Sequence, residues 1–330
     1  MINRFTSRRQ FLGAAALAMA AVTGLSGMAA AQGNYPEKPV TIISPYPPGS
    51  FGDVFPRAVA DLLTQRMGQN FLVENRPGAT HMIGARAAAD AKPDGYTLLF
   101  GSVTTFALNP SLQPNLPYDP LKDFAPVSLS YETPLFLVTR PDLDVDNVQD
   151  LVKLLKDNPG KYTFASGGIG SSTHLAGELF KVLAGVDARH VPYAGTGPAM
   201  VDVMAGHVDF VFSGSGLAQS EGGRLKVLAV TSAKRTESAP DVPTMQESGV
   251  DDYQSSIWFG FVAPDGTPPE ITKAIADTIR EGTDDLRKRL GDTVADGTFV
   301  NSSPEEFGDF IANEIPRWKK VIDAGNIEVE

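Results

Sequence analysis

Apolar residues recur along the chain at two alternating spacings, which predicts a regular succession of strands and helices. The run from Val40 to Ile43 is rich in β-branched residues and is typical of a buried strand. A proline- and glycine-rich stretch ends this run and leads into apolar residues that recur at helical spacing as far as Met67. Pro56 is compatible with that helix if it lies in the first turn, where its missing N–H would have no partner.

The same alternation continues through most of the chain. Further strands are predicted at 71–73, 96–100, 127–139 with an interruption at Pro134, 162–165, around Val191, 208–212 and 227–230. Helices are predicted at 82–91, 148–155, 172–183 and 198–205. Alternation of this kind favours an α/β fold in which helices cover both faces of mainly parallel sheets.

Two helices near the end are predicted from their first residues. Thr267 and Ser303 are each followed by proline and, three residues on, by glutamate, which is the pattern of an N-cap hydroxyl with a glutamate at N3. Pro316 falls inside the second of these helices and is expected to kink or restart it. Loop-like stretches near 131–134 and 251–256 are interpreted as two crossings between two lobes.

The first 31 residues read as a removable export signal. Ser7 to Leu12 contains a twin-arginine pattern, a Gly/Ala-rich apolar run follows, and Ala29 to Ala31 forms a small-residue cleavage site. The alternative is a membrane anchor, but a span needs about 20 strongly apolar residues and this run is short. We therefore expect a periplasmic protein that is exported by the twin-arginine route.

Charge and cysteine content narrow the range of partners. Removing residues 1–31 takes away three arginines and no acidic residue, so the net charge changes from −11 to −14. Such an acidic surface argues against binding to nucleic acid or anionic lipid. The absence of cysteine excludes disulfides, thiol nucleophiles and thiolate metal sites, so the chain must rely on its core.

Four loops that follow predicted strands are rich in glycine and hydroxyl residues. They begin near Tyr46, Gly101, Ser166 and Tyr193. In open parallel sheets ligands gather at the carboxyl ends of strands, and exposed amides at helix N-termini attract anions. Together the loops predict a site for a small anionic ligand, although each could also be an ordinary turn.

No catalytic motif is convincing. The four histidines, His81, His174, His190 and His207, lack metal-ligand spacing, so structural or solvent-facing roles are favoured. A hydrolase that uses Ser171 or Ser213 is a weak alternative because no general base is held against either hydroxyl. We expect no cofactor, no metal and no enzymatic activity.

Several motifs resemble the Bug family of periplasmic solute-binding proteins, which serve tripartite tricarboxylate transporters. They include Tyr35-Pro-Glu-Lys-Pro-Val40, Val73-Glu-Asn-Arg-Pro-Gly78, Lys92-Pro-Asp-Gly-Tyr-Thr-Leu98, Leu116-Pro-Tyr-Asp-Pro120, His174-Leu-Ala-Gly-Glu-Leu-Phe180, Leu228-Ala-Val-Thr-Ser-Ala-Lys-Arg235 and Pro240-Asp-Val-Pro-Thr244. The resemblance implies a two-lobed periplasmic-binding-protein clamshell that closes on a small carboxylate, works with the transporter's membrane subunits and performs no chemistry. We expect residues 32–133 and 254–330 to form the first lobe, residues 134–253 to form the second, and the protein to be a monomer.

The resemblance also suggests which residues hold the ligand. The family binds one carboxylate through the first strand–helix loop, partly by water, and the rest through the loop of the second lobe. Combined with the loop pattern, this predicts contacts from Tyr46, Gly49, Ser50, Phe51, Gly52, Asp53, Ser102, Thr104, Thr105, Ser166, Gly168, Ile169, Gly170, Ser171, Ser172, His174, Tyr193, Gly195, Thr196 and Ser213. Because neither main loop contains Lys or Arg, we expect backbone amides and hydroxyls to hold the carboxylate, with Asp53 acting through a water.

The chain departs from the family pattern at two places, and both bear on the ligand. Ser50 and Phe51 follow Pro48-Gly49 where the family usually has a second glycine; Phe51 packs either on an aromatic or longer ligand or in the space between lobes. Thr80 and His81 replace small Gly or Asn, so His81 is either a charged group at the anion site or a surface-loop residue. A receptor that presents its ligand to a sensor kinase would have the same fold and remains an alternative function.

Overall fold

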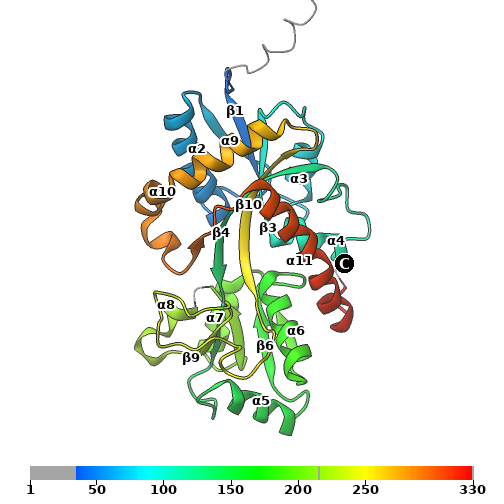
Figure 1. The fold of residues 1–330 in the computed structure, drawn as a ribbon. Coiled ribbons are helices and arrows are strands. Elements are labelled where there is room, and N and C mark those ends of the chain that lie inside the picture. The colour runs from blue at the N-terminus through cyan, green and yellow to red at the C-terminus, as the bar shows by residue number, and fades with distance from the viewer. Residues whose placement is uncertain (1–34, 215, 329–330) are drawn as a thin grey trace, which may run out of the picture. The chain divides into compact units, whose positions relative to one another are not determined.

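The computed structural model describes residues 35–328 apart from residue 215. The predicted signal segment lies outside the described residues. Residues 35–37 belong to a separate unit, so the description below concerns residues 38–328 (Figure 1). Within the described part of the chain, no helix combines the length and the apolarity needed to cross a membrane.

The first lobe is built on a six-stranded sheet with the order β11-β4-β10-β3-β1-β2. Its strands are β1 (Val40–Ser44), β2 (Phe71–Asn75), β3 (Thr97–Ser102), β4 (Phe124–Pro134), β10 (Ser256–Pro264) and β11 (Thr298–Phe299). Strand β1 is parallel to β2 and β3, whereas β10 is antiparallel to β3 and β4. The parallel half therefore carries the strand–loop–helix units, and the antiparallel half carries the connections to the second lobe.

The second lobe is built on a five-stranded sheet with the order β7-β6-β8-β5-β9. Its strands are β5 (Phe136–Thr139), β6 (Thr163–Ser166), β7 (Arg189–Pro192), β8 (Phe210–Ser213) and β9 (Lys226–Val230). Strand β6 is parallel to β7 and β8, while β5 is antiparallel to β8 and β9. Both sheets are mixed, but most strands in each run in one direction, so the expectation of mainly parallel sheets is confirmed. Only β10 and β11 oppose the others in the first sheet, and only β5 does so in the second.

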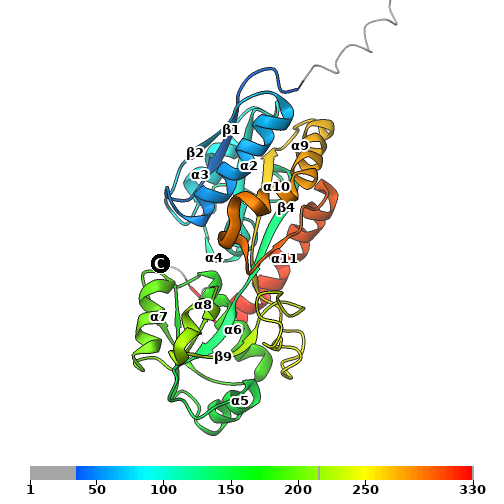
Figure 2. The same ribbon diagram turned by 90° about the vertical axis from the view of Figure 1, so that its left-hand side faces the viewer.

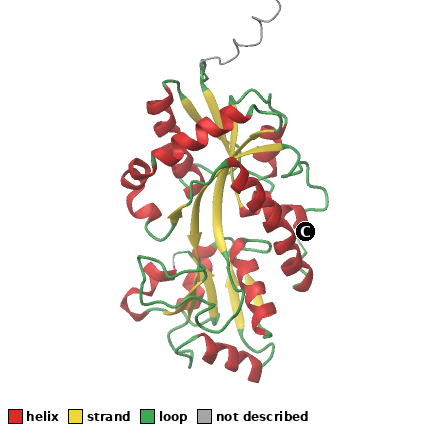
Figure 3. Cartoon of the chain, in the orientation of Figure 1, coloured by secondary structure: helices red, strands yellow, loops and turns green. Residues whose placement is uncertain are grey.

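Helices flank both sheets (Figures 2 and 3). They are α2 (Phe51–Met67), α3 (Met82–Ala89), α4 (Asn109–Leu112), α5 (Val148–Asp157), α6 (Ser172–Ala184), α7 (Thr196–Met204), α8 (Gly216–Ser220), α9 (Pro269–Glu281), α10 (Thr283–Leu290) and α11 (Pro304–Ala324). Short π- and 3₁₀-helical turns lie at η1 (Thr104–Leu108), η2 (Glu221–Gly223) and η3 (Gly291–Val294). The α/β fold class predicted from the alternation is confirmed.

The two lobes are joined by paired segments rather than by loose linkers. Strand β4 leads through Leu135 into β5, and Ser256 at the start of β10 lies opposite Pro134. The Thr231 amide donates to the Leu135 carbonyl, and the Thr231 hydroxyl is 2.7 Å from the Leu135 nitrogen. The crossings and the residue boundaries of the lobes stay a prediction.

A continuous apolar core also links the lobes. Helix α11 packs on α6, and the same buried cluster contains Trp318 and Ile322 from α11 together with Leu179 from α6. The Tyr253 hydroxyl donates to the Ala176 carbonyl at 2.9 Å, which ties the returning segment to α6. Any movement between the lobes must therefore either keep α11 packed on α6 or let the two helices slide along each other.

Of the two N-caps predicted near the end of the chain, one is confirmed and the other is wrong. Ser303 caps α11 with a full capping box to Glu306, as predicted. At α9 the N-cap is Pro268 without a side-chain bond, because the Thr267 hydroxyl instead donates to the Pro264 carbonyl at 2.7 Å. Helix α11 continues through Pro316 without restarting.

Candidate functional site

The first loop predicted to bind the ligand lies between β1 and α2, at the carboxyl end of the parallel half of the sheet. The loop after β3 reaches the same edge, because β1 and β3 are parallel neighbours. Helix α2 begins at Phe51 with Ser50 as N-cap. The sequence-predicted residues from Tyr46 to Asp53 and from Ser102 to Thr105 are thus brought to one edge of the first lobe.

Asp53 is buried, and its carboxylate holds this loop in place through hydrogen bonds. Its carboxylate accepts hydrogen bonds from the Gly49 amide at 2.9 Å, the Arg57 Nε at 2.8 Å and the Asn75 Nδ2 at 2.8 Å. Burial alone would raise the pKa of Asp53, but these hydrogen bonds and the charge of Arg57 outweigh it and lower the pKa. Asp53 is ionised at neutral pH, and its oxygens accept from one amide of the loop and from two side chains outside it.

Gly52 permits the closest packing in the loop. A Cβ atom there would lie 2.1 Å from the Tyr46 ring, so only glycine fits against this tyrosine. We expected Pro56 in the first turn of α2, but it is the sixth residue of that helix. Pro56 has no N–H and cannot donate to the Gly52 carbonyl. The Ser44 hydroxyl donates to that carbonyl instead, at 2.6 Å, which explains how the helix tolerates an internal proline.

Two backbone amides at the start of α2 have no hydrogen-bond partner among the described residues, those of Phe51 and Gly52. They are the first two amides of the helix, where the helix dipole also favours an anion. Gly49, which we expected to be a donor, is bound to Asp53. The first lobe therefore offers one compact pair of donors.

Phe51 belongs to an aromatic cluster of the first lobe. Its ring centroid lies 5.4 Å from that of Phe55, 5.3 Å from that of Tyr131 and 4.8 Å from that of Phe259. Phe51 remains partly exposed. This packing fixes the ring at the start of α2 and leaves one part of it available to a ligand.

His81 lies behind the first loop in a strained segment. Ala79, Thr80 and His81 all have positive φ, at 45°, 49° and 74°, which costs non-glycine residues roughly 1–2 kcal/mol each. The His81 ring centroid is 4.4 Å from that of Tyr46, and its Nδ1 is 3.3 Å from the Thr105 hydroxyl. Burial lowers the pKa of His81 to about 4, so the interpretation of His81 as a charged group at neutral pH is wrong. The residue is partly buried, with its ring against Tyr46.

The remaining first-lobe residues support this arrangement. The Tyr46 hydroxyl is buried and faces Ser102 and Thr105 without a well-formed hydrogen bond, and burial raises the pKa of Tyr46. Ser102 and Thr105 are themselves buried. Thr104, which begins η1, is only partly buried and has no hydrogen bond from its hydroxyl among the described residues.

The second ligand loop lies between β6 and α6 and is rigidly bonded to itself. The Gly167 amide donates to the Thr173 hydroxyl at 2.9 Å, Gly168 to the Ser166 hydroxyl at 3.1 Å, and Gly170 to His174 Nδ1 at 3.1 Å. The Ser171 hydroxyl donates to the Gly168 carbonyl and also caps α6 through the His174 amide. The amides of these three glycines are therefore not open donors for a carboxylate, because side chains of the same segment accept their N–H groups.

The donors that remain in this loop are the amides of Ile169, Ser172 and Thr173 and the Ser172 hydroxyl, none of which has a partner among the described residues. Ser172 and Thr173 are the first two residues of α6. The second lobe therefore repeats the arrangement of the first, with two adjacent free amides at a helix N-terminus. The Ile169 side chain is 54% exposed and stands beside them.

His174 and His190 form a stacked pair behind this loop. Their ring centroids are 3.7 Å apart, and the planes differ by 16°. His190 Nε2 lies 2.6 Å from the Ser166 hydroxyl, and the buried Glu178 lies between His174 and Lys181. Burial, and to a lesser degree the neighbouring His174, lower the pKa of His190 to about 4. A structural role, one of the two expected for these histidines, fits this geometry, and His174 contacts the loop through Nδ1, which accepts from the Gly170 amide.

The loop after β7 packs against the second ligand loop. A Cβ at Gly167 would lie 3.3 Å from Thr196 Cγ2, and Gly195 has a φ of 118°, which favours glycine. The Tyr193 hydroxyl donates to Asp202 at 2.7 Å, and burial together with this bond raises the pKa of Tyr193 to about 12. Ser213 is buried at the end of β8. The structure therefore brings together the two loops predicted in each lobe.

Some residues outside the loops, which were not predicted from the sequence, hold the loops in place by hydrogen bonds. Arg57 binds both Asp53 and Asn75, and Asn75 also donates to the Tyr46 carbonyl at 3.1 Å. The i, i+4 spacing of Asp53 and Arg57 could have indicated this pair. Asn75 and His190 carry no such local signal, because they come from other strands.

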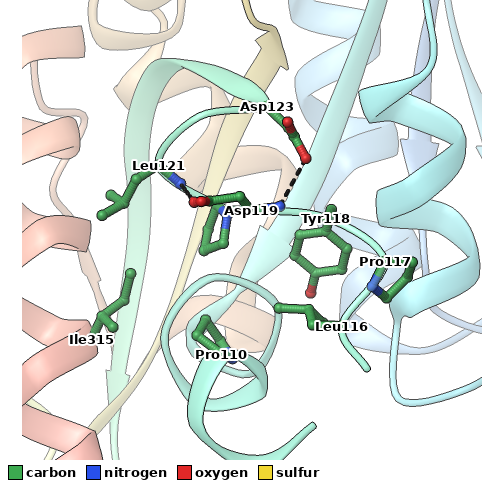
Figure 4. Close-up of a pocket in the computed structure, with 9 residues that line it drawn as sticks. Pro110, Leu116, Pro117, Tyr118, Asp119, Leu121, Asp123 and Ile315 are labelled. Atoms are coloured by element: carbon green, nitrogen blue, oxygen red, sulfur yellow. Dashed lines mark hydrogen bonds between the residues drawn. The ribbon is translucent and has the colours of Figure 1, made fainter. Parts of the chain in front are cut away.

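Two cavities lie away from these loops. One of about 540 Å³ is lined by Pro110, Tyr118, Asp119 and Ile315, among others, and its prolines leave few free donors (Figure 4). Another of about 380 Å³ lies between β4, β11 and the segment after β9. Neither is lined by a sequence-predicted ligand residue. Among the described residues, no cluster of three His, Cys, Asp or Glu side chains could hold a metal ion.

Comparison with known proteins identifies the family. The model described as "Tripartite tricarboxylate transporter family receptor" matches residues 55–327. The chain belongs to this family. Protein BugT of Bordetella pertussis is similar to this receptor, with 38% identity over 87% of this chain and 89% of BugT. The resemblance to Bug proteins found in the sequence is confirmed.

Solved structures with more than 25% identity agree in fold. R. palustris Rpa4515 with adipate shares 32% identity and a TM-score of 0.75, over 89% of this chain and 99% of that one. MatC from Rhodopseudomonas palustris with bound malate shares 30% identity and a TM-score of 0.71, over 87% of this chain and 100% of MatC. The receptor is accordingly a periplasmic solute-binding protein of a tripartite transporter and not an enzyme, so the hydrolase alternative is rejected.

Proposed function

We propose that the receptor captures a small carboxylate between the start of α2 and the start of α6 and delivers it to the membrane subunits of its transporter. One observation carries this proposal: each lobe presents two adjacent free amides at the N-terminus of a long helix. Two helix N-termini suit a ligand with anionic or strongly polar groups at both ends. Rpa4515 was solved with adipate and MatC with malate, which agrees with this class of ligand.

The free amides and the Ser172 hydroxyl hold the ligand in this proposal, while Asp53, Tyr46, Ser166 and His174 position them. Asp53 contacts the ligand at most through water, because its carboxylate would repel another one. Phe51 and Ile169 supply apolar surface on either side, which extends the candidates to longer or aromatic carboxylates.

The amides can be tested by proline substitution. Ser172 is the first residue of α6, where proline fits the helix and removes the N–H together with the hydroxyl. Ser171 has the extended conformation (ψ 158°) that a following proline requires. Calorimetry with adipate, malate and benzoate should first identify a ligand. Ser172→Pro should then weaken binding at least about tenfold, because a hydrogen bond to a charged group contributes about 1.5–3 kcal/mol.

Ser172→Ala is the matched control, since it removes the hydroxyl and keeps the amide. We expect a smaller loss of affinity, and for both variants thermal unfolding of the empty protein like that of the parent. Parent-like affinity in Ser172→Pro would place the ligand elsewhere. A parent that binds none of the three carboxylates with micromolar affinity would reject the proposed ligand class.

Export by the twin-arginine route is proposed from Ser7 to Leu12. Replacing Arg8 and Arg9 with lysine should leave the precursor inside the cell, measured by fractionation. Unchanged periplasmic yield would indicate the general secretory route instead.

A further inference from the structure

The most strained backbone in the described part of the chain lies directly behind the proposed ligand site. Three consecutive non-glycine residues, Ala79, Thr80 and His81, have left-handed φ values, and Gly78 before them has a φ of 125°. Strain of this kind persists only where surrounding contacts hold it, and it concentrates at functional sites. Here the Asn109 side chain donates to the Thr80 carbonyl at 2.9 Å.

The strained segment delivers one side chain to the site, the imidazole of His81. This ring bridges the two donor loops of the first lobe, with the Tyr46 ring in contact and the Thr105 hydroxyl 3.3 Å from Nδ1. The Thr105 hydroxyl in turn accepts from the Ser102 amide at 3.4 Å. His81 is therefore the common neighbour of the loop after β1 and the loop after β3.

Tyr46 transmits the position of His81 to the ligand donors. The Tyr46 ring lies directly on Gly52, where no Cβ could be accommodated. The Gly52 amide is one of the two free donors at the start of α2. A change in the His81 ring would thus move the Tyr46 ring and, through it, the first turn of α2.

We propose that His81 is a positioning residue for ligand binding: its strained backbone holds the imidazole against Tyr46 and thereby fixes the amides of Phe51 and Gly52. This inference rests on the proposed function of those amides. His81 touches no ligand and acts as an uncharged ring. The two side chains in contact with the ring, Tyr46 and Thr105, are also uncharged, so the donors on this side of the site stay neutral.

Two substitutions separate the ring from the hydrogen bond. His81→Asn keeps tolerance for the left-handed backbone and a polar group for Thr105, but it removes the ring. His81→Phe keeps a ring against Tyr46 and removes the bond to Thr105. We expect affinity for the carboxylate identified by calorimetry to fall at least about tenfold in His81→Asn and to stay within about threefold of the parent in His81→Phe.

Hydrogen exchange of the empty protein provides a readout that needs no ligand. Amides in the segment 46–55 should exchange several-fold faster in His81→Asn than in the parent, and at parent-like rates in His81→Phe. Tyr46→Leu removes the other ring of the contact and should reproduce the effect if His81→Asn fails to fold. Because the measurement is ligand-free, it tests His81 even if no carboxylate binds.

Thr80→Asn is the matched control, because its exposed side chain lies in the same strained turn without touching Tyr46. It should leave both affinity and exchange in 46–55 unchanged. Equal losses in Thr80→Asn and His81→Asn would show general loosening of the turn and overturn the proposal. So would parent-like exchange in His81→Asn, or a His81→Phe variant as impaired as His81→Asn.

Discussion

Asp53 shows how a buried charge stabilises a loop that is otherwise built of glycine and proline. Three donors from three segments meet on its carboxylate, so removing it takes the shared acceptor away from Gly49, Arg57 and Asn75. Because these donors are exposed or only partly buried, water replaces the carboxylate in part, and Asp53→Ala should lower the free energy of unfolding by about 1–3 kcal/mol, measured by urea denaturation, in addition to weakening ligand binding.

Asp61→Ala is the control for this prediction. Asp61 lies on the same helix but forms an exposed ion pair with Arg289, which contributes at most about 1 kcal/mol. If both substitutions lower the free energy of unfolding by the same amount, the hydrogen bonds of Asp53 do not stabilise the loop.

His190 makes the stability of the second lobe depend on pH. Its pKa in the folded state, about 4, lies below the unfolded value of 6.5, so the unfolded chain binds the proton more readily between these values. Stability should be complete above pH 6.5 and should fall as the pH approaches 4, by roughly 2 kcal/mol for a partly exposed ring. His81 has the same direction of shift and should add to the loss.

His190→Phe keeps the stacking on His174 and removes the titration. Its melting temperature should change less between pH 7 and pH 4 than that of the parent. The window lies above the range in which carboxylates such as Asp53 lose their contribution, which begins near pH 4. An identical pH dependence in parent and variant would exclude His190 as the cause.

At the scale of the element, helix α2 depends on a hydroxyl from the strand before it. Pro56 leaves the Gly52 carbonyl without its helical donor, and Ser44 in β1 replaces that donor. Ser44→Ala should destabilise the protein by about 1–3 kcal/mol, because it leaves a buried carbonyl without a partner.

A double-mutant cycle with Pro56→Ala tests this explanation directly. In the Pro56→Ala background the helix supplies its own N–H to Gly52, so Ser44→Ala should cost at least about 1 kcal/mol less than in the parent. Additive effects in urea denaturation would mean that Ser44 does not compensate for the proline.

At the scale of the whole molecule, ligand binding is expected to bring the two lobes together. The free amides lie on different lobes, and a ligand that contacts both stabilises the closed arrangement. The β4 and β10 crossings are paired through Ser256 and Pro134, so closure should proceed by bending this two-stranded connection while α11 stays packed on α6.

Small-angle scattering measures this closure. Saturation with the carboxylate identified by calorimetry should reduce the radius of gyration of the parent. Ser172→Pro at the same ligand concentration should keep the profile of the empty protein. A parent profile unchanged by saturating ligand would contradict closure on binding.

Much of the architecture could be predicted from the sequence because its signals are local. The β-branched run at Val40–Ser44, the helical spacing in α6 and the capping box of Ser303 and Glu306 each depend on residues within a few positions of one another. The motifs likewise identified the family, and the four loops were placed correctly at strand ends. These features need no knowledge of the rest of the chain.

The tertiary structure decided which groups in those loops are available. Gly49, Gly167, Gly168 and Gly170 looked alike in the sequence as open donors, but Asp53, Thr173, Ser166 and His174 accept their amides. The left-handed conformation of His81, its neutrality and its contact with Tyr46 depend on burial among segments far apart in the chain. Hydrogen-bond satisfaction and desolvation are set by neighbours in space, so the sequence predicted which loops hold the ligand, and only the fold decided which of their donors are free.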